Sequence, residues 1–195
     1  MQIKKLKGNS GNLIEGPLLI TPEVKRDDRG YFFEAWNQKM FSSKTNFFKD
    51  FNQDNISYSN KGTIRGLHYQ MKPYAQSKLV SCLHGSIYDV AVDLRKESET
   101  FGDWVGVNLN SDNFLQFWIP EGFAHGFLVT SNECKVQYKV SGYWSKNHER
   151  GISWKDDDLK IEWPIKHHDI SDVKINLKDK NASSFKKIKK DGDFF

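Results

Sequence analysis

The stretch GTIRGLHYQ, residues 62–70, carries two reactive side chains inside a strand-like pattern. Successive side chains of a strand point to opposite faces, so Arg65 and His68 would lie on different sides of a regular strand. A glycine inside a strand often marks a bulge. We therefore expect a kink at Gly66 that re-aims one of the two side chains and lets both enter one cavity.

Short alternating runs with turn residues between them continue along the chain. In SIYDVAVDL, residues 86–94, apolar side chains alternate with aspartates, and further short runs bring the count to at least six strands over residues 77–140. The segment 34–41 could form a short helical turn, but no long periodic helix interrupts the strands. This pattern predicts a mainly β protein, a jelly-roll barrel or sandwich with a few short helices, mostly near the C-terminus.

Two aspartates in that run raise separate questions. Alternation places Asp89 and Asp93 on one strand face with Ile87 and Ala91. We expect Asp93 to face water. For Asp89 the pattern leaves two possibilities open, a water-facing carboxylate or one that points into a polar barrel interior.

The charge is concentrated at one end of the chain. The formal net charge is +4, and residues 178–195 contain six lysines and three aspartates. The rest is nearly neutral, which argues against a nucleic-acid-binding face, since such a face clusters basic residues on folded structure. We expect one domain over residues 1–195, with a solvated Lys-rich tail from about residue 178 whose composition is typical of partial disorder. The pattern leaves open whether this tail stays mobile or folds over the pocket.

The two cysteines and the N-terminus bear on the compartment. Cys82 and Cys134 both lie in apolar, strand-like runs, which predicts buried thiols rather than a disulfide framework. The N-terminal segment is basic but lacks the apolar core of a signal peptide, and no apolar run reaches membrane-spanning length. A cytoplasmic protein without membrane association is the expectation.

A second motif, WIPEGFAHGF at 118–127, places His125 after Pro120 and Gly122. With GTIRGLHYQ it resembles the two metal-binding motifs of cupins, but Gln70 stands where the first motif has its second histidine. Glutamine is a poor ligand for divalent metals beside histidine. We therefore expect a cupin-like barrel without a metal, in which His68 is free to act as a base near neutral pH.

The chain also resembles the dTDP-4-dehydrorhamnose 3,5-epimerases, sugar-nucleotide epimerases of the cupin superfamily, from about Gly16 to Phe185. The order and spacing of the motifs agree throughout. They lie at residues 27–34, 51–59, 63–70, 75–80, 85–95, 98–110, 117–127, 136–144, 149–164 and 177–181.

The resemblance implies four catalytic roles. His68 is similar to the general base that removes the C3 and C5 protons of a 4-keto sugar. Lys78 corresponds to the cation that stabilises the enolate oxygen, and Tyr138 to the general acid on the opposite face. Asp179 matches the carboxylate that orients the histidine. Its segment departs from the family pattern because Asn176 replaces a serine, and Asp169 or Asp172 are alternatives.

The resemblance further implies a substrate-binding set and a homodimer. N-terminal strands would pair with the partner subunit, and two residues of the 27–34 motif, Arg29 and Glu34, would bind nucleotide in its site. No cofactor is implied. The full binding set is Arg65, Arg29, Glu34, Gln53, Asn55, Asp89, His125 and Tyr143, with Arg65 a substrate and diphosphate contact and Tyr143 the ring near the base.

The leading hypothesis is epimerisation at C3 and C5 of dTDP-4-dehydro-6-deoxy-D-glucose to dTDP-4-dehydro-L-rhamnose. The alternatives are an epimerase of one centre only, an epimerase of another nucleotide-linked 4-keto sugar such as a GDP-sugar, and a non-catalytic sugar-binding jelly roll. The combination of His68, Lys78, Tyr138 and Asp179 argues against the last, because a lectin needs no base and acid. Gln70 argues against a metal-dependent cupin oxygenase or isomerase.

Overall fold

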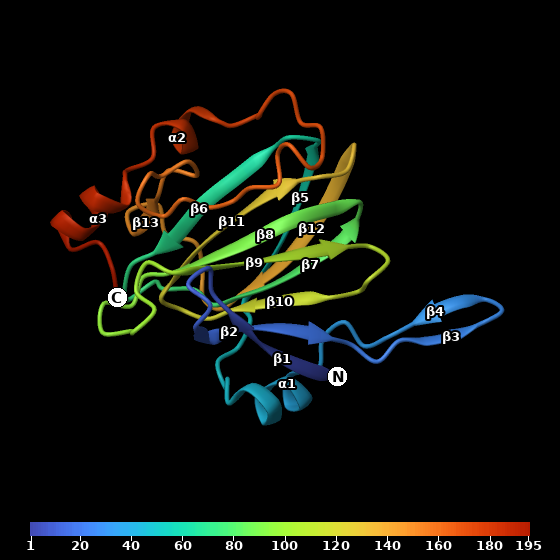
Figure 1. Ribbon diagram of the computed structural model, residues 1–195. Helices are drawn as coiled ribbons and strands as arrows, with labels where there is room; N and C mark the ends of the chain where they lie inside the picture. Colours follow the sequence, from blue (N-terminus) through green and yellow to red (C-terminus); the bar gives the residue numbers. More distant parts are fainter.

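The computed structural model describes residues 1–195 and consists mainly of two antiparallel sheets packed face to face (Figure 1). The six-stranded sheet runs, in spatial order, β1 (Gln2–Lys7), β2 (Leu13–Thr21), β10 (Gln116–Ile119), β7 (Lys78–His84), β12 (Glu133–Val140) and β5 (Gln53–Asn60). The five-stranded sheet runs β13 (Glu149–Gly151), β6 (Ile64–Gln70), β11 (Phe123–Val129), β8 (Ser86–Asp93) and β9 (Trp104–Asn110).

The remaining elements are a hairpin and three short helices. The hairpin consists of β3 (Lys25–Asp27) and β4 (Gly30–Phe32), and the helices are α1 (Gln38–Thr45), α2 (Leu177–Lys180) and α3 (Phe185–Asp191). None of the helices is long and apolar enough to cross a bilayer. The predicted mainly β, jelly-roll architecture with few short helices is confirmed, and the region 77–140 contains β7 to β12.

The main core fills the space between the sheets. It combines inward side chains of both sheets, for example Val80 of β7, Ile87 of β8 and Phe117 of β10. Cys82 and Cys134 belong to it as free thiols, which confirms that both are buried. Burial of this apolar surface is the dominant contribution to the stability of such a sandwich.

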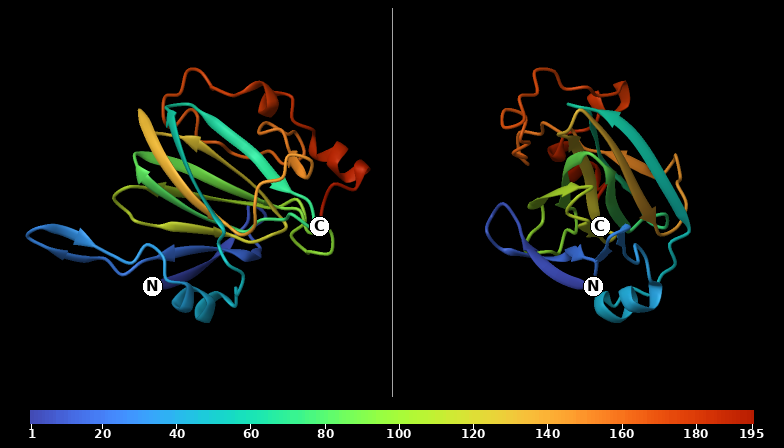
Figure 2. Two further views of the ribbon diagram at one scale, coloured as in Figure 1. Left: turned by 180° about the vertical axis from the view of Figure 1, so that it is seen from behind. Right: turned by 90° about the vertical axis from the view of Figure 1, so that its right-hand side faces the viewer.

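Each sheet is also covered on its outer face. Helix α1 packs Phe41 on Trp118 of the six-stranded sheet, with ring centroids 5.0 Å apart. The C-terminal segment crosses the outside of the five-stranded sheet (Figure 2). Its Phe185 and Ile188 are buried there in one cluster with Leu67 and Val90. Strand β11 is therefore buried along its whole length.

The expectation of a partly disordered tail is wrong. Ser184 caps α3 by accepting a hydrogen bond from the Lys187 N–H, and Phe185 and Ile188 are only 5% and 2% exposed. The backbone N–H of Phe195 donates to the Leu94 carbonyl at 2.9 Å. The lysines of the segment lie on its solvent-exposed side, as the composition predicted. Its few apolar residues pack into the core cluster on the outside of the five-stranded sheet.

The expectation that Asp93 faces water is also wrong. Its carboxylate is fully buried and accepts hydrogen bonds from Arg95, Ser98 and Thr100. Burial alone would raise the pKa of Asp93, but these bonds outweigh it and lower the pKa. Asp93 thus stabilises the loop after β8 through these hydrogen bonds. Asp89 is also fully buried, so of the two possibilities left open by the sequence, the barrel interior is the one observed.

Strand β6 contains the expected bulge at Gly66. His68 pairs with His125 of β11 while Arg65 pairs with Phe127, so two residues of β6, Gly66 and Leu67, oppose the single Gly126 of β11. Gly66 has a φ of +116°, and a Cβ there would lie 2.6 Å from the Gly126 Cα. The extra residue reverses the alternation, and Arg65 and His68 consequently line the same cavity.

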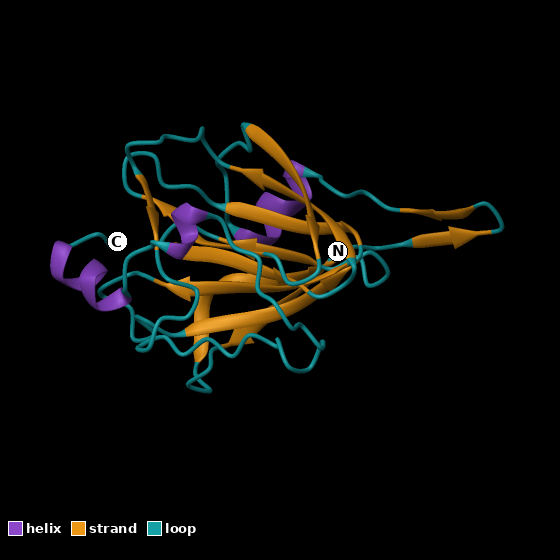
Figure 3. Cartoon of the chain, turned by 90° about the horizontal axis from the view of Figure 1, so that it is seen from above, coloured by secondary structure: helices purple, strands orange, loops and turns teal.

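The β3–β4 hairpin projects away from the sandwich as an arm, clearly visible from above (Figure 3). It exposes Tyr31 and Phe32, which are 57% and 68% accessible to solvent. Arg26 lies over the rings of Tyr31 and Phe114 at 5.7 and 5.2 Å, which steadies the base of the arm.

We predict that Gly66→Ala lowers the free energy of unfolding by about 3 kcal/mol or more, because its methyl group would overlap the backbone of β11. Gly142→Ala is the matched control, since Gly142 also has a positive φ but no atom within 4 Å of its Cβ position. It should lose only about 1 kcal/mol. Urea denaturation measures both, and equal losses would contradict the close approach as the cause.

Candidate active site

Two adjoining cavities open between the sheets, and His68, Lys78 and Tyr138 line both of them. The outer cavity, of about 350 Å³, is further lined by Gln53, Asn55, Tyr69, Gln70, Gln76, Trp144 and Glu149. The inner cavity, of about 120 Å³, is further lined by Ser57, Arg65, His125, Phe127, Asn176 and Asp179.

His68 forms a close pair with Asp179. Its Nε2 lies 2.6 Å from Asp179 Oδ1, and Asp179 is 2% exposed. The Gly66 N–H and the Asn176 side-chain amide donate to the other carboxylate oxygen. Burial alone would raise the pKa of Asp179, but the hydrogen bond and charge of His68, with the Gly66 bond, hold it below its usual range.

The local fold explains how Asp179 reaches that position. Asn176 is the N-cap of α2, and its side chain accepts a hydrogen bond from the Asp179 N–H at 2.7 Å. Asparagine caps helices as effectively as serine, so the replacement of the family's serine keeps the turn. Of the three aspartates considered from the sequence, Asp179 is the one that contacts His68.

Lys78 approaches from the opposite sheet. Its ammonium donates to the His68 carbonyl oxygen at 3.2 Å, and the residue is only 9% exposed. Burial lowers the pKa of Lys78 to about 8, while the charges of Asp89 and Glu149 partly offset that effect. A cation with few partners therefore faces the cavity, where it would be attracted to a developing oxyanion.

Tyr138 of β12 stands beside Lys78 on the wall formed by the six-stranded sheet. Burial raises the pKa of its phenol, the nearby Arg65 charge opposes that shift, and Glu149 adds to it. Tyr138 thus remains a protonated donor at neutral pH. The arrangement sets a histidine on one wall of the inner cavity and a phenol on the other.

A second histidine–carboxylate pair adjoins the inner cavity, which His125 lines. His125 Nε2 is 2.6 Å from Asp89 Oδ1, and both side chains are buried. Burial lowers the pKa of His125, and the adjacent Asp89 only partly counteracts it. The lowered pKa keeps His125 neutral at pH 7, and the Asp89 carboxylate is one of the charges that raise the pKa of Lys78.

Arg65, Gln53 and Asn55 are held on one side of the cavities. Arg65 donates from Nε to Ser59 Oγ at 3.0 Å and from Nη2 to the Tyr58 carbonyl. Gln53 and Asn55 are hydrogen-bonded to each other at 2.8 Å and line the outer cavity. The structure brings these three binding candidates together with the four catalytic candidates.

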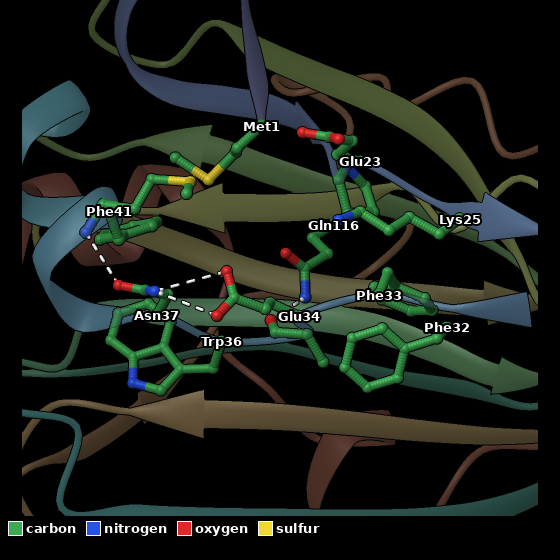
Figure 4. A pocket seen from close by; sticks show the side chains of 13 residues that line it. Met1, Glu23, Lys25, Phe32, Phe33, Glu34, Trp36, Asn37, Phe41 and Gln116 are labelled. Atoms are coloured by element: carbon green, nitrogen blue, oxygen red, sulfur yellow. Dashed lines mark hydrogen bonds between the residues drawn. The ribbon is translucent and has the colours of Figure 1, made fainter.

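Three binding candidates lie elsewhere in this chain. Arg29 sits on the projecting hairpin, paired with Asp27. Glu34 lines a separate hollow of about 310 Å³ near α1, where it accepts hydrogen bonds from Asn37 (Figure 4). The side chain of Tyr143 is 67% exposed and lines neither cavity, and its neighbour Trp144 lines the outer one instead.

Gln70 joins two loops at the cavity mouth. Its Nε2 donates to the Tyr74 and Tyr143 carbonyls, and its Oε1 accepts from the Ser145 N–H at 2.5 Å. Both ends of the amide are therefore engaged with backbone. No group of three or more His, Cys, Asp or Glu side chains is arranged to hold a metal ion. The predicted metal independence stays a prediction.

Sequence reasoning missed several cavity residues. Alternation along β5 could have found Ser57, because it follows the inward Gln53 and Asn55 at spacing two. Nothing local indicated the cavity positions of Asn176, Glu149 or Trp144, since each depends on how distant loops close over the site.

The fold is a cupin-like barrel, and the histidines, lysine and tyrosine that line its inner cavity are side chains suited to proton transfer. A model of the family dTDP-4-dehydrorhamnose 3,5-epimerase matches residues 12–187. A dTDP-4-dehydrorhamnose 3,5-epimerase of Shigella flexneri is 54% identical over 159 residues, covering 82% of this chain and 88% of that protein. The chain therefore belongs to the dTDP-4-dehydrorhamnose 3,5-epimerase family.

Solved structures agree with this assignment. The dTDP-4-dehydrorhamnose 3,5-epimerase of Elizabethkingia anophelis superposes with a TM-score of 0.86 at 43% identity, covering 96% of this chain and 98% of that one. A dTDP-6-deoxy-D-glucose-3,5-epimerase of Legionella pneumophila, solved with dTDP-4-keto-L-rhamnose, gives a TM-score of 0.85 at 40% identity, covering 94% and 93% of the two chains.

We predict that Lys78 titrates near pH 8, well below an ordinary lysine, because burial disfavours its charged form. Asp89→Asn should lower the midpoint further by removing a stabilising negative charge. Carbon-13 NMR of labelled lysine side chains measures both midpoints. A wild-type midpoint near the usual value of about 10.4 would show that Lys78 is hydrated rather than buried.

Proposed function

We propose that this protein epimerises C3 and C5 of dTDP-4-dehydro-6-deoxy-D-glucose to give dTDP-4-dehydro-L-rhamnose. The observation that carries the proposal is the inner cavity, where His68 faces Lys78 and Tyr138 from the opposite wall. Inversion at carbon needs a base on one face and an acid on the other, with positive charge at the developing oxyanion.

His68 acts as the base. With Nε2 bonded to Asp179, its Nδ1 makes no hydrogen bond within the protein and is free to accept a proton. The C4 ketone acidifies the hydrogens on both flanking carbons, so one base can serve C3 and then C5 as the ring shifts. The ionised Asp179 stabilises the imidazolium that forms and holds the ring in one orientation.

Lys78 stabilises the enolate oxygen at C4, and Tyr138 returns a proton to the carbon from the other face. A charge confined in a hollow with few other partners interacts more strongly than it would in water. Tyr138 is weakly acidic, so it stays protonated until the basic enolate carbon forms. Every group in this scheme is a side chain of the protein, and no cofactor enters it.

The nucleotide end of the substrate extends through the outer cavity. In this proposal Arg65 contacts the diphosphate from the inner cavity, and Gln53 and Asn55 contact the nucleotide in the outer one. The exposed Tyr143, outside both cavities, lies near the base. His125 lines the sugar pocket, with Asp89 buried against it as a second polar member. The dTDP-sugar in the related Legionella structure supports this class of substrate.

A homodimer follows from the same proposal. The hairpin extends its apolar rings and Arg29 away from the chain's own cavities, which suits insertion beside a second copy where Arg29 and Glu34 reach the nucleotide. Residues 1–195 would form one catalytic domain per subunit. A cytoplasmic location stays part of the proposal and is consistent with its free cysteines.

Incubation with dTDP-4-dehydro-6-deoxy-D-glucose in deuterated water, followed by NMR, tests the activity. We expect deuterium at both C3 and C5, and at least a hundredfold slower exchange in His68→Ala because the base is gone. Tyr138→Phe should still exchange deuterium, since His68 can return it from the same face, but should form little inverted product.

Other results would redirect the proposal. Exchange at a single carbon would indicate an epimerase of one centre. Exchange only with a GDP-linked 4-keto sugar would change the nucleotide, and binding of the dTDP-sugar without exchange would indicate a sugar-binding protein. Full exchange in His68→Ala would refute His68 as the base.

We predict that Phe32→Asp weakens dimer formation at least tenfold, because a carboxylate would be buried where the hairpin meets a second copy. Leu177→Asp is the control, since Leu177 is similarly exposed, at 75% compared with 68%, but lies on α2 far from the hairpin. Analytical ultracentrifugation measures both. A wild-type monomer, or equal weakening in the two variants, would contradict the hairpin interface.

A further inference from the structure

Two buried side-chain oxygens in the whole chain lack a hydrogen-bond partner; one lines the inner cavity and the other belongs to a residue bonded to the cavity residue His125. They are Ser57 Oγ and Asp89 Oδ2. Asp89 is a carboxylate whose other oxygen is bound to His125, and its charge is balanced by the nearby Lys78. Ser57 has no such explanation, because a neutral hydroxyl gains nothing from burial without a partner.

Ser57 belongs to a polar row on the inner side of β5. Gln53, Asn55, Ser57 and Ser59 follow at spacing two, so their side chains share one face. Gln53 and Asn55 bond to each other, and Ser59 accepts from Arg65. Ser57 is the one member of the row whose side chain has no partner in the protein.

The position of Ser57 indicates what kind of partner is missing. It lines the inner cavity together with His68, Lys78 and Tyr138. Its strand neighbours β12, where Ser57 pairs with Val136 and Asn55 with Tyr138, so the hydroxyl faces the cavity from the Tyr138 wall. Whatever reacts between His68 and Tyr138 therefore lies against Ser57.

We propose that the Ser57 hydroxyl hydrogen-bonds a hydroxyl group on the sugar ring and so holds the ring between base and acid. This inference rests on the proposed function, which it extends by a positioning residue. A sugar that fills a cavity of about 120 Å³ displaces water from it, and an unpaired Ser57 would then oppose binding. A pyranose with ring hydroxyls supplies the partner at that moment.

The contact also explains how selectivity for the sugar would arise. A site built to hydrogen-bond a hydroxyl discriminates against an analogue that lacks it, because its own polar group is left unpaired. Ser57 would thus favour a ring that retains its hydroxyl over the corresponding deoxy sugar, without itself moving a proton. Removal of the Ser57 hydroxyl should raise KM more than it lowers kcat.

The test compares Ser57→Thr with Ser57→Val, which have nearly the same shape and differ in one hydroxyl. Deuterium exchange at C5 of dTDP-4-dehydro-6-deoxy-D-glucose is the readout. We expect Ser57→Thr to stay within about threefold of wild type in kcat/KM, and Ser57→Val to lose about tenfold, mainly through KM. Thermal melting of each variant checks that the fold is intact.

Analogues of the same substrate lacking the C2 or the C3 hydroxyl identify the contact. Both keep the C5 hydrogen and the C4 ketone, so exchange at C5 remains measurable. With the wild-type protein, removing the contacted sugar hydroxyl should lower kcat/KM about tenfold, as Ser57→Val does with the full substrate. In Ser57→Val, removing the same sugar hydroxyl should cause no further loss of kcat/KM, because the serine and sugar hydroxyls bond to each other.

Equal kcat/KM for the threonine and valine variants would overturn the role of Ser57. So would additive effects of Ser57→Val and of each deoxy analogue on kcat/KM. Neither result would contradict the epimerase activity. Absence of C5 exchange in the wild type would instead refute the proposed function, and the inference with it. Ser43→Ala, an exposed serine on α1, is the control and should match wild type.

Discussion

The site depends on the close approach of two backbones, β6 at Gly66 and β11 at Gly126. A Cβ on Gly66 would lie 2.6 Å from the Gly126 Cα, and a Cβ on Gly126 would lie 2.8 Å from the Arg65 carbonyl oxygen. Only two glycines permit this contact. It accommodates the bulge that turns Arg65 and His68 into one cavity, and it leaves the Gly66 N–H free to bond Asp179.

The two sheets that form the walls of the cavities carry different functional groups. The five-stranded sheet contributes His68, His125 and Asp89, and α2 adds Asp179, so that His68 pairs with Asp179 and His125 with Asp89. The six-stranded sheet contributes Lys78 from β7, the phenol of Tyr138 from β12 and the hydroxyl of Ser57 from the edge strand β5. Because each side chain is inside a packed sandwich, it keeps its position without a ligand, which is the preorganisation that electrostatic catalysis requires.

The outer layers stabilise this arrangement from behind. The C-terminal segment packs Phe185 and Ile188 on the five-stranded sheet and places α2 so that Asp179 reaches His68. A segment with many lysines is therefore part of the catalytic unit, and loosening it would displace the carboxylate. The hairpin, in contrast, lines the hollow near α1 with Lys25 and Phe32 but contributes no residue to the two cavities around His68.

The sequence by itself determined the alternating strands, the kink at Gly66 and the family, because these depend on local periodicity and on motif order. His68, Lys78 and Tyr138 could be named from motifs alone. Only the tertiary structure decided that Asp93 is buried, that the lysine-rich tail folds and that Ser57 is left without a partner. Those features depend on contacts between residues far apart in the chain, and local pattern carries no information about which distant groups will meet a given side chain.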